Sequence, residues 1–192
     1  KWSSLCDGVS AQSNYASLVP VYLHRGQYKH ALRAFYDALT TGLYEETRML
    51  AGRVRHPGQG EGPWYALTEE AELVYALRCL LVLEHNDELW LLSGVPDAWL
   101  EPGQRIEIEG AATWFGPMDV HVQALAEPTR VVIDLNAPRR ERPTRIMLHL
   151  HRPLSSVLLN GQPLTTFDAS QGTIELPGDV GRVNLVAYQP AP

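Results

Sequence analysis

The spacing of apolar residues changes near residue 86, and this change limits the chain to a small set of folds. Upstream, apolar side chains recur in steps of three and four, the period of one helix face, at Tyr28, Leu32, Phe35, Leu39 and Leu43. Downstream, apolar and polar residues alternate in short segments bounded by Gly, Pro, Asn and Asp. The sequence therefore predicts an α+β protein, with a helical segment at 1–85 and an antiparallel β-sandwich at 86–192.

The helical segment carries its own start and stop signals. A first helix is expected over Tyr15–Leu23, with a kink or a fresh start at Pro20 and an end near Gly26. The helix that begins at Tyr28 is expected to weaken or stop at Gly42. The clearest helix is expected over Thr68–Leu83. From Leu73 to Leu83 it is apolar almost all round, so we expect other elements to cover most of its surface.

The second part reads as a series of short strands. They are "ELWLL", "QRIEIEG", "MDVHVQAL", "TRVVIDL", "TRIMLHLH", "SVLLN", "GTIEL" and "GRVNLVAY". Asn160-Gly161 between apolar runs is a strong signal for a β-hairpin. Strands of this length and spacing are typical of a β-sandwich or barrel.

The segment that joins the two parts contains large anchoring side chains. Trp90, Leu92 and Trp99 lie in "NDELWLLSGVPDAWLEPGQ", a poor composition for a flexible linker. We therefore expect this segment to be held by both parts, and the two parts to unfold together.

The composition disfavours several function classes. The 192 residues are 45% hydrophobic and 20% charged, an ordinary globular balance, and the net charge of -6 argues against general affinity for nucleic acid or an anionic membrane. No apolar run approaches the roughly 20 residues of a membrane-spanning helix. The sequence shows no phosphate-binding loop, no dinucleotide fingerprint and no Cys-His zinc pattern, so no cofactor is predicted.

The histidines allow a metal site but favour a simpler explanation. His149 and His151 form an H-x-H pair whose side chains would share one face of a strand, and His121 could add a third ligand from another strand. A polar outer face of the sandwich explains the pair without a metal, so no metal ligand is predicted. The basic stretch "PRRERPTR" is interpreted in the same way, as a solvated connector between strands.

Five stretches of the sequence carry a family resemblance, namely "EEAELVYALRCLLVLE", "LWLLSGVPDAWL", "TWFGP", "RPTRIMLHLHRP" and "LLNGQPL". In this order they resemble the late part of bacterial glycoside hydrolases that have an (α/α)6-toroid catalytic domain. In that family the last toroid helices run into a C-terminal β-sandwich. The resemblance implies a carbohydrate ligand and a sandwich that buttresses the helical catalytic domain. It also implies that most of the toroid lies upstream of Lys1 or in a partner chain. The chain alone would then lack a complete active site and release no sugar.

The loop "HPGQGEGPWY" carries the side chains that suit this chemistry. Glycosidases use paired carboxylates, and Glu61 lies between glycines that let a ligand approach the backbone. We predict Glu61 as a catalytic residue, and His56, Trp64 and Tyr65 as substrate-binding residues, because aromatic faces stack on sugar rings. The alternative is a surface loop whose aromatic residues anchor the next helix. For the whole chain, the alternative function is a non-catalytic module that binds a glycan or another protein.

Overall fold

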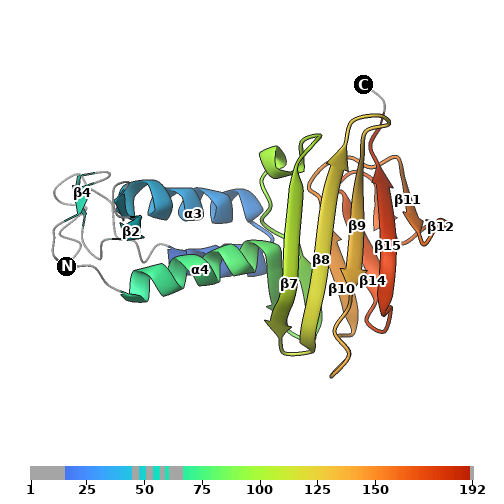
Figure 1. Cartoon of the computed structure of the whole chain (residues 1–192), viewed down its shortest axis with the longest axis horizontal. Helices are drawn as coiled ribbons and strands as arrows, with labels where there is room; N and C mark the ends of the chain where they lie inside the picture. The colour runs from blue at the N-terminus through green and yellow to red at the C-terminus, as the bar shows by residue number, and fades with distance from the viewer. Residues whose placement is uncertain (1–15, 45–47, 51–53, 57–58, 61–66, 191–192) are drawn as a thin grey trace. The chain divides into compact units, whose positions relative to one another are not determined.

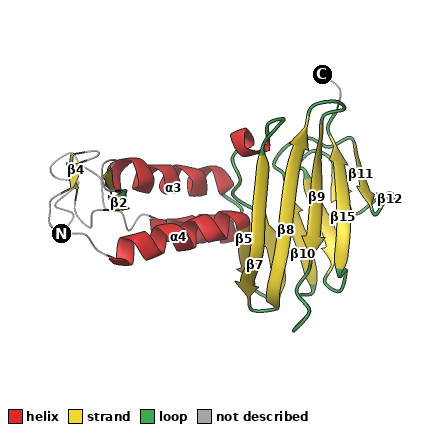
Figure 2. Cartoon of the chain, in the orientation of Figure 1, coloured by secondary structure: helices red, strands yellow, loops and turns green. Residues whose placement is uncertain are grey.

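The computed structural model describes residues 16–44, 48–50, 54–56, 59–60 and 67–190. The chain divides into two compact units, Lys1–Leu81 and Val82–Pro192. Within the described residues, helices α2, α3 and α4 belong to the first unit, and the two large sheets belong to the second. Figure 2 draws the helices in red and the strands in yellow. The predicted α+β class is therefore confirmed. No helix in these ranges is long and apolar enough to cross a lipid bilayer.

The first two helices follow the sequence signals closely. Helix α2 spans Leu18–His24, so Pro20 lies in its first turn, where a missing N–H is tolerated. The chain then turns at Gly26, whose φ of 68° favours glycine. Helix α3 spans Tyr28–Gly42 and ends at the predicted glycine.

The buried face of α3 differs from the predicted stripe. Phe35 is buried as expected, but Leu32 and Leu39 are only half-buried. Small residues make up the rest of the buried face, namely Ala31, Ala34, Ala38 and Gly42. The helix therefore packs through Phe35 and its small residues, and not through the leucines of the predicted stripe.

Helix α4 spans Leu67–Leu81. It begins one residue before the predicted start and ends two residues before the predicted end. Val82–His85 instead forms strand β5 of the sandwich. The division between the units thus lies four residues before the predicted boundary. Hydrogen bonding to a neighbouring strand overrides the helical pattern here, because β-branched Val82 and its successors pair with β6.

Two short strand pairs follow α3 in the chain. Strand β1 (Leu43–Tyr44) pairs with β2 (Met49–Leu50), and β3 (Val54–His56) pairs with β4 (Gln59–Gly60), both antiparallel.

The second unit is built from two sheets. The five-stranded sheet has the order β13-β14-β10-β6-β5, and the six-stranded sheet has the order β12-β11-β15-β9-β8-β7, whose labelled strands can be followed in Figure 1. The remaining bounds are β6 Glu88–Leu91, β7 Arg105–Thr113, β8 Gly116–Leu125, β9 Arg130–Asn136, β10 Arg145–His149, β11 Ser156–Leu159, β12 Gln162–Leu164, β13 Phe167–Asp168, β14 Thr173–Pro177 and β15 Arg182–Tyr188. A 3-10 helix, η2, spans Asp97–Leu100.

Alternation along the strands forms the sandwich core. In the six-stranded sheet, Val120, Leu135 and Val183 share one register row and are all buried. In the five-stranded sheet, Leu148 and Leu91 are paired and fully buried. This period of two turns one face of each sheet toward the core and leaves the other polar or mixed.

All eight predicted strands are present, and the Asn160-Gly161 hairpin is confirmed. The two residues have φ values of 50° and 80° and connect β11 to β12, as a tight primed turn requires. One pairing departs from the antiparallel prediction, because β10 runs parallel to β6. That pair is far apart in sequence, so no local pattern signals its direction.

Trp90, Leu92 and Trp99 all belong to the sandwich unit. Trp90 lies in β6 and Trp99 lies in η2, while Leu92 is fully buried with a φ of 60°. The expectation that the two units unfold together stays a prediction.

Candidate functional site

The loop that sequence analysis singled out falls largely outside the described residues. Glu61, Trp64 and Tyr65 are among the residues that the structure does not describe, and His56 is seen only as the backbone of β3, paired with Gln59 of β4. Their catalytic and substrate-binding roles stay predictions.

The predicted histidine pair belongs to a row of rings on the five-stranded sheet. The ring of His85 stacks on Trp90 with centroids 4.0 Å apart, Trp90 lies 5.1 Å from His149, and His149 lies 5.8 Å from His151. Because His151 follows the end of β10 and has a φ of 54°, it does not continue the strand as the sequence pattern predicted. It still reaches the same cluster.

The electrostatics of this row oppose a charged imidazole. Burial lowers the pKa of His149 to about 4, helped by the neighbouring His151 and opposed by Glu88. Nε2 of His149 has no hydrogen-bond partner among the described residues. The third histidine of the alternative, His121, lies in the other sheet, 3.7 Å from Glu109. Within the described ranges no group of three His, Cys, Asp or Glu side chains could hold a metal ion.

An ion pair anchors the same row. Arg145 lies 2.6 Å from Glu88, and the indole N–H of Trp90 donates to the other carboxylate oxygen of Glu88 at 2.7 Å. Burial alone would raise the pKa of Glu88, but the hydrogen bonds from Arg145 and Trp90 outweigh it and lower that pKa. With the charges of Glu88 and Arg145 paired, this cluster holds Trp90 in place.

A second polar region lies at one end of the six-stranded sheet and begins with the β7–β8 turn. The hydroxyl of Thr113 donates to the carbonyl of Gly116 at 2.6 Å, which closes the turn around Trp114 and Phe115. Phe115 is buried, whereas 64% of Trp114 is exposed. The turn thus holds an indole in solvent on a fixed backbone.

The segment after β9 packs closely against this turn. Gly116 has a φ of 119°, and a Cβ at that position would lie 3.0 Å from Cβ of Arg140. The close approach lets Arg140 donate to the carbonyl of Trp114 at 2.6 Å. Glycine is required here because a side chain would push the arginine segment away from the turn.

The outer face of the sheet supplies the other wall. Asp119, Asn136 and Arg182 are direct neighbours in the strand register. Asn136 donates to Asp119 at 2.9 Å, and the Gly110 N–H donates to the same carboxylate at 2.8 Å. These hydrogen bonds, the one from Asn136 foremost, lower the pKa of Asp119 and keep it ionised.

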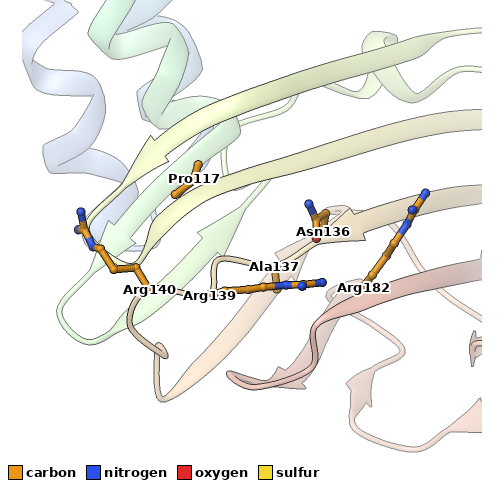
Figure 3. Close-up of a pocket in the computed structure, with 6 residues that line it drawn as sticks. All are labelled: Pro117, Asn136, Ala137, Arg139, Arg140 and Arg182. Atoms are coloured by element: carbon orange, nitrogen blue, oxygen red, sulfur yellow. The ribbon is translucent and has the colours of Figure 1, made fainter.

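Together these parts line an open pocket of about 390 Å³, which we call the arginine pocket. Its lining residues are Pro117, Asn136, Ala137, Arg139, Arg140 and Arg182. Figure 3 shows Arg139 reaching from the loop toward Asn136 and the base of Arg182, whose own side chain extends onward in a direction away from Arg139, whereas Arg140 points the opposite way. Among the described residues, neither Arg139 nor Arg182 has a carboxylate within ion-pair distance, although Arg182 interacts with Asp119 at longer range. Both guanidinium groups can therefore donate hydrogen bonds to a ligand.

The sequence analysis does not predict this pocket. It interprets Arg139 and Arg140 as parts of a solvated connector, and it does not single out Arg182 at the start of its strand. A possible signal was the pairing of TRVVIDLN with GRVNLVAY as neighbouring strands, which would have brought Asn136 and Arg182 together. Trp114 entered only through the resemblance, as part of "TWFGP".

Comparison with solved structures finds glycoside hydrolases. A GH127 β-arabinofuranosidase aligns with 93% of this chain at 11% identity and a TM-score of 0.46, and the match covers 32% of that chain. A second structure, described as a glycoside hydrolase, aligns with 85% of this chain and 29% of its own at 10% identity and a TM-score of 0.42. A GH31 dextranase from Flavobacterium johnsoniae aligns with 53% of this chain and 16% of its own at 7% identity and a TM-score of 0.35.

This chain thus spans less than a third of the length of each of these solved structures. No protein-family model matches the chain. No curated protein matches it significantly.

Proposed function

We propose that this chain is part of a carbohydrate-active protein of the glycoside hydrolase type. In this proposal the helices belong to a larger helical catalytic domain, the end of an α/α toroid, and the sandwich buttresses it. The sequence resemblance gives the order of the two parts. The direct step from the last residue of α4, Leu81, to the first residue of β5, Val82, supports it, because the units follow one another without a linker.

The observation that carries the proposal is the apolar surface of α4. Leu67 and Val74 are seven residues apart, and Leu77 follows after three, so they share one helix face. Their exposed fractions are 79%, 67% and 36%, and the neighbouring Tyr75 is 53% exposed. Contiguous apolar surface of this kind marks a site where another element packs. Further helices, from the same polypeptide or from a partner chain, are the cover that a toroid supplies.

The alternative function, a non-catalytic module that binds a glycan, has its own support. Trp114 presents an indole to solvent on a turn fixed by Arg140 and Gly116. An exposed aromatic ring on a rigid turn next to hydrogen-bonding side chains is suited to stacking on a sugar ring. Binding through Trp114 and catalysis through the helical part are compatible in one protein.

The catalytic part of the proposal rests on the predicted loop. Glu61 would act as one of the two carboxylates, with His56, Trp64 and Tyr65 around the sugar. The test is the release of reducing sugar from a panel of plant and bacterial polysaccharides by the polypeptide that carries this chain in nature. We expect Glu61→Gln to abolish release and Glu69→Gln, at the start of α4, to preserve it. Full release of sugar by the Glu61→Gln variant would show that Glu61 is not a catalytic carboxylate.

The same assay separates the two functions. The 192-residue chain alone is expected to bind polysaccharide without releasing sugar. Trp64→Ala in the natural polypeptide distinguishes the two roles of the loop, because a substrate-binding Trp64 lowers turnover while the melting temperature holds. A large fall in melting temperature with unchanged turnover per folded molecule would show that Trp64 only anchors α4.

A further inference from the structure

We propose that the arginine pocket binds the carboxylate of an acidic saccharide, a uronic acid unit. The saccharide part of this inference rests on the proposed function, whereas the anion part rests on the pocket alone. Arg139 and Arg182 supply two guanidinium groups, and arginine binds carboxylates through paired N–H donors in one plane.

The second wall of the pocket suits hydroxyl groups. Nδ2 of Asn136 already donates to Asp119, so its carbonyl oxygen is the atom that faces a ligand as an acceptor. A sugar hydroxyl can donate to that oxygen while the carboxylate of the same ring lies on the arginines. A uronic acid carries both groups on one ring, and a volume of about 390 Å³ falls within the range of small-molecule sites.

The charges around the pocket select against more highly charged ligands. Asp119 is the direct register partner of Asn136, and Asp134 and Glu109 lie on the same outer face of the sheet, near His121. These carboxylates repel a ligand that extends several negative charges over the sheet. A singly charged, hydroxyl-rich ligand meets the arginines without meeting that repulsion, which favours a uronic acid over nucleic acid.

The parts of the pocket have different roles. Arg139 and Arg182 are the binding residues. Arg140 donates to the carbonyl of Trp114 and points away from the other two, so it is a positioning residue for the loop. Gly116 serves the same purpose, because it lets the arginine segment lie against the β7–β8 turn.

The test is calorimetric or NMR titration of the full chain with D-glucuronate and D-galacturonate. Their neutral parents, glucose and galactose, inorganic phosphate and a short DNA oligonucleotide are titrated in parallel. We expect the uronates to bind at least about tenfold more tightly than the neutral sugars, since hydrogen bonds to charged groups contribute roughly 1.5–3 kcal/mol. Arg139→Gln and Arg182→Gln should each weaken uronate binding by a similar factor.

Matched variants keep the result interpretable. Arg105→Gln removes an exposed arginine from the same sheet but outside the pocket, and it should bind uronate as the unaltered chain does. Arg182→Lys keeps the charge and loses the planar pair of donors, so intermediate affinity is expected. Circular dichroism establishes that each variant is folded; if Arg182→Gln is not, Arg139→Gln alone carries the test.

Three results would overturn the inference. They are equal affinity for uronates and neutral sugars, uronate binding that survives both glutamine variants, and tighter binding of phosphate or the oligonucleotide than of either uronate. Loss of uronate binding alone leaves the proposed function standing if the chain still binds neutral polysaccharides. Tight uronate binding without any polysaccharide binding would preserve the anion site and contradict the glycan function.

Discussion

The two units of this chain differ in how many large apolar side chains they expose to solvent. The exposed large apolar side chains of the described residues are Leu18, Val21, Tyr36, Leu67, Val74, Tyr75, Leu77 and Trp114, and all but Trp114 lie in the helical unit. The sandwich turns its alternating apolar residues inward from two sheets and closes its own core. The described helices leave part of their wide apolar faces exposed.

This difference in exposed apolar surface indicates which contacts stabilise each unit. Among the described residues of the sandwich, Trp114 is the one exposed large apolar side chain, and it lies at a fixed turn. The described part of the helical unit presents several such side chains along α4. In the proposed function, further helices cover this surface.

The largest expected effect comes from truncating one apolar side chain in each unit and comparing the losses in the free energy of unfolding. Leu148→Ala, in the fully buried core of the sandwich, should lower the free energy of unfolding by about 2–5 kcal/mol. Val74→Ala, on the exposed face of α4, should change it by no more than about 0.5 kcal/mol. Urea unfolding of the 192-residue chain measures both. A loss above 2 kcal/mol in Val74→Ala would mean that this face is already covered.

A backbone substitution sharpens the description of the sandwich. Gly116→Ala should cost about 1–3 kcal/mol, because its φ of 119° disfavours a side chain and the new Cβ meets Arg140. Gly161→Ala is the matched control, since its φ of 80° is also positive but nothing lies within 4 Å. Melting curves and uronate titration are compared for both. Only Gly116→Ala should weaken uronate binding; equal effects would show that the arginine segment does not depend on this contact.

The row of rings predicts a pH effect that belongs to the sandwich. The pKa of His149 is about 4 in the folded chain, below its ordinary 6.5, so the unfolded chain takes up a proton first as the pH falls. The stability linked to His149 is complete above pH 6.5 and is lost as the pH falls toward 4. Between pH 8 and pH 5 the loss should be about 1–2 kcal/mol.

His149→Gln is the variant that isolates this effect. The pKa of His151 is also lowered by burial, so the variant should reduce the slope of stability against pH and leave a remainder. Carboxyl groups with lowered pKa values, such as Glu88, act only at lower pH. Denaturant unfolding at pH 8, 6.5 and 5 measures the slope. An unchanged slope in the variant would mean that His149 is not buried as described.

The sequence predicts local structure better than it predicts sites. Gly26, Gly42 and the Asn160-Gly161 turn end or join elements through their own backbone preferences, so their roles are visible in the sequence. Strand alternation also depends only on neighbouring residues, and every predicted strand is present. Local rules of this kind account for the α+β class.

Features that depend on pairing between segments are missed or misplaced by the sequence analysis. Val82–His85 forms a strand because it closes a hairpin with β6, although its sequence continues the helical pattern. The arginine pocket combines a loop, a turn and two strand ends, and Asn136 meets Arg182 only through the sheet register. No spacing along the chain encodes such a meeting.

Polysaccharide binding by the 192-residue chain tests the carbohydrate function most directly. In affinity gel electrophoresis with neutral and acidic polysaccharides, we expect at least one to retard the chain. Trp114→Ala should then weaken that binding about two- to tenfold, the range that stacking of one aromatic ring contributes. Tyr75→Ala, which removes an exposed aromatic ring from α4, should leave it unchanged. If no polysaccharide retards the chain, or if Trp114→Ala binds as tightly as the unaltered chain, the sandwich does not bind glycans through this turn.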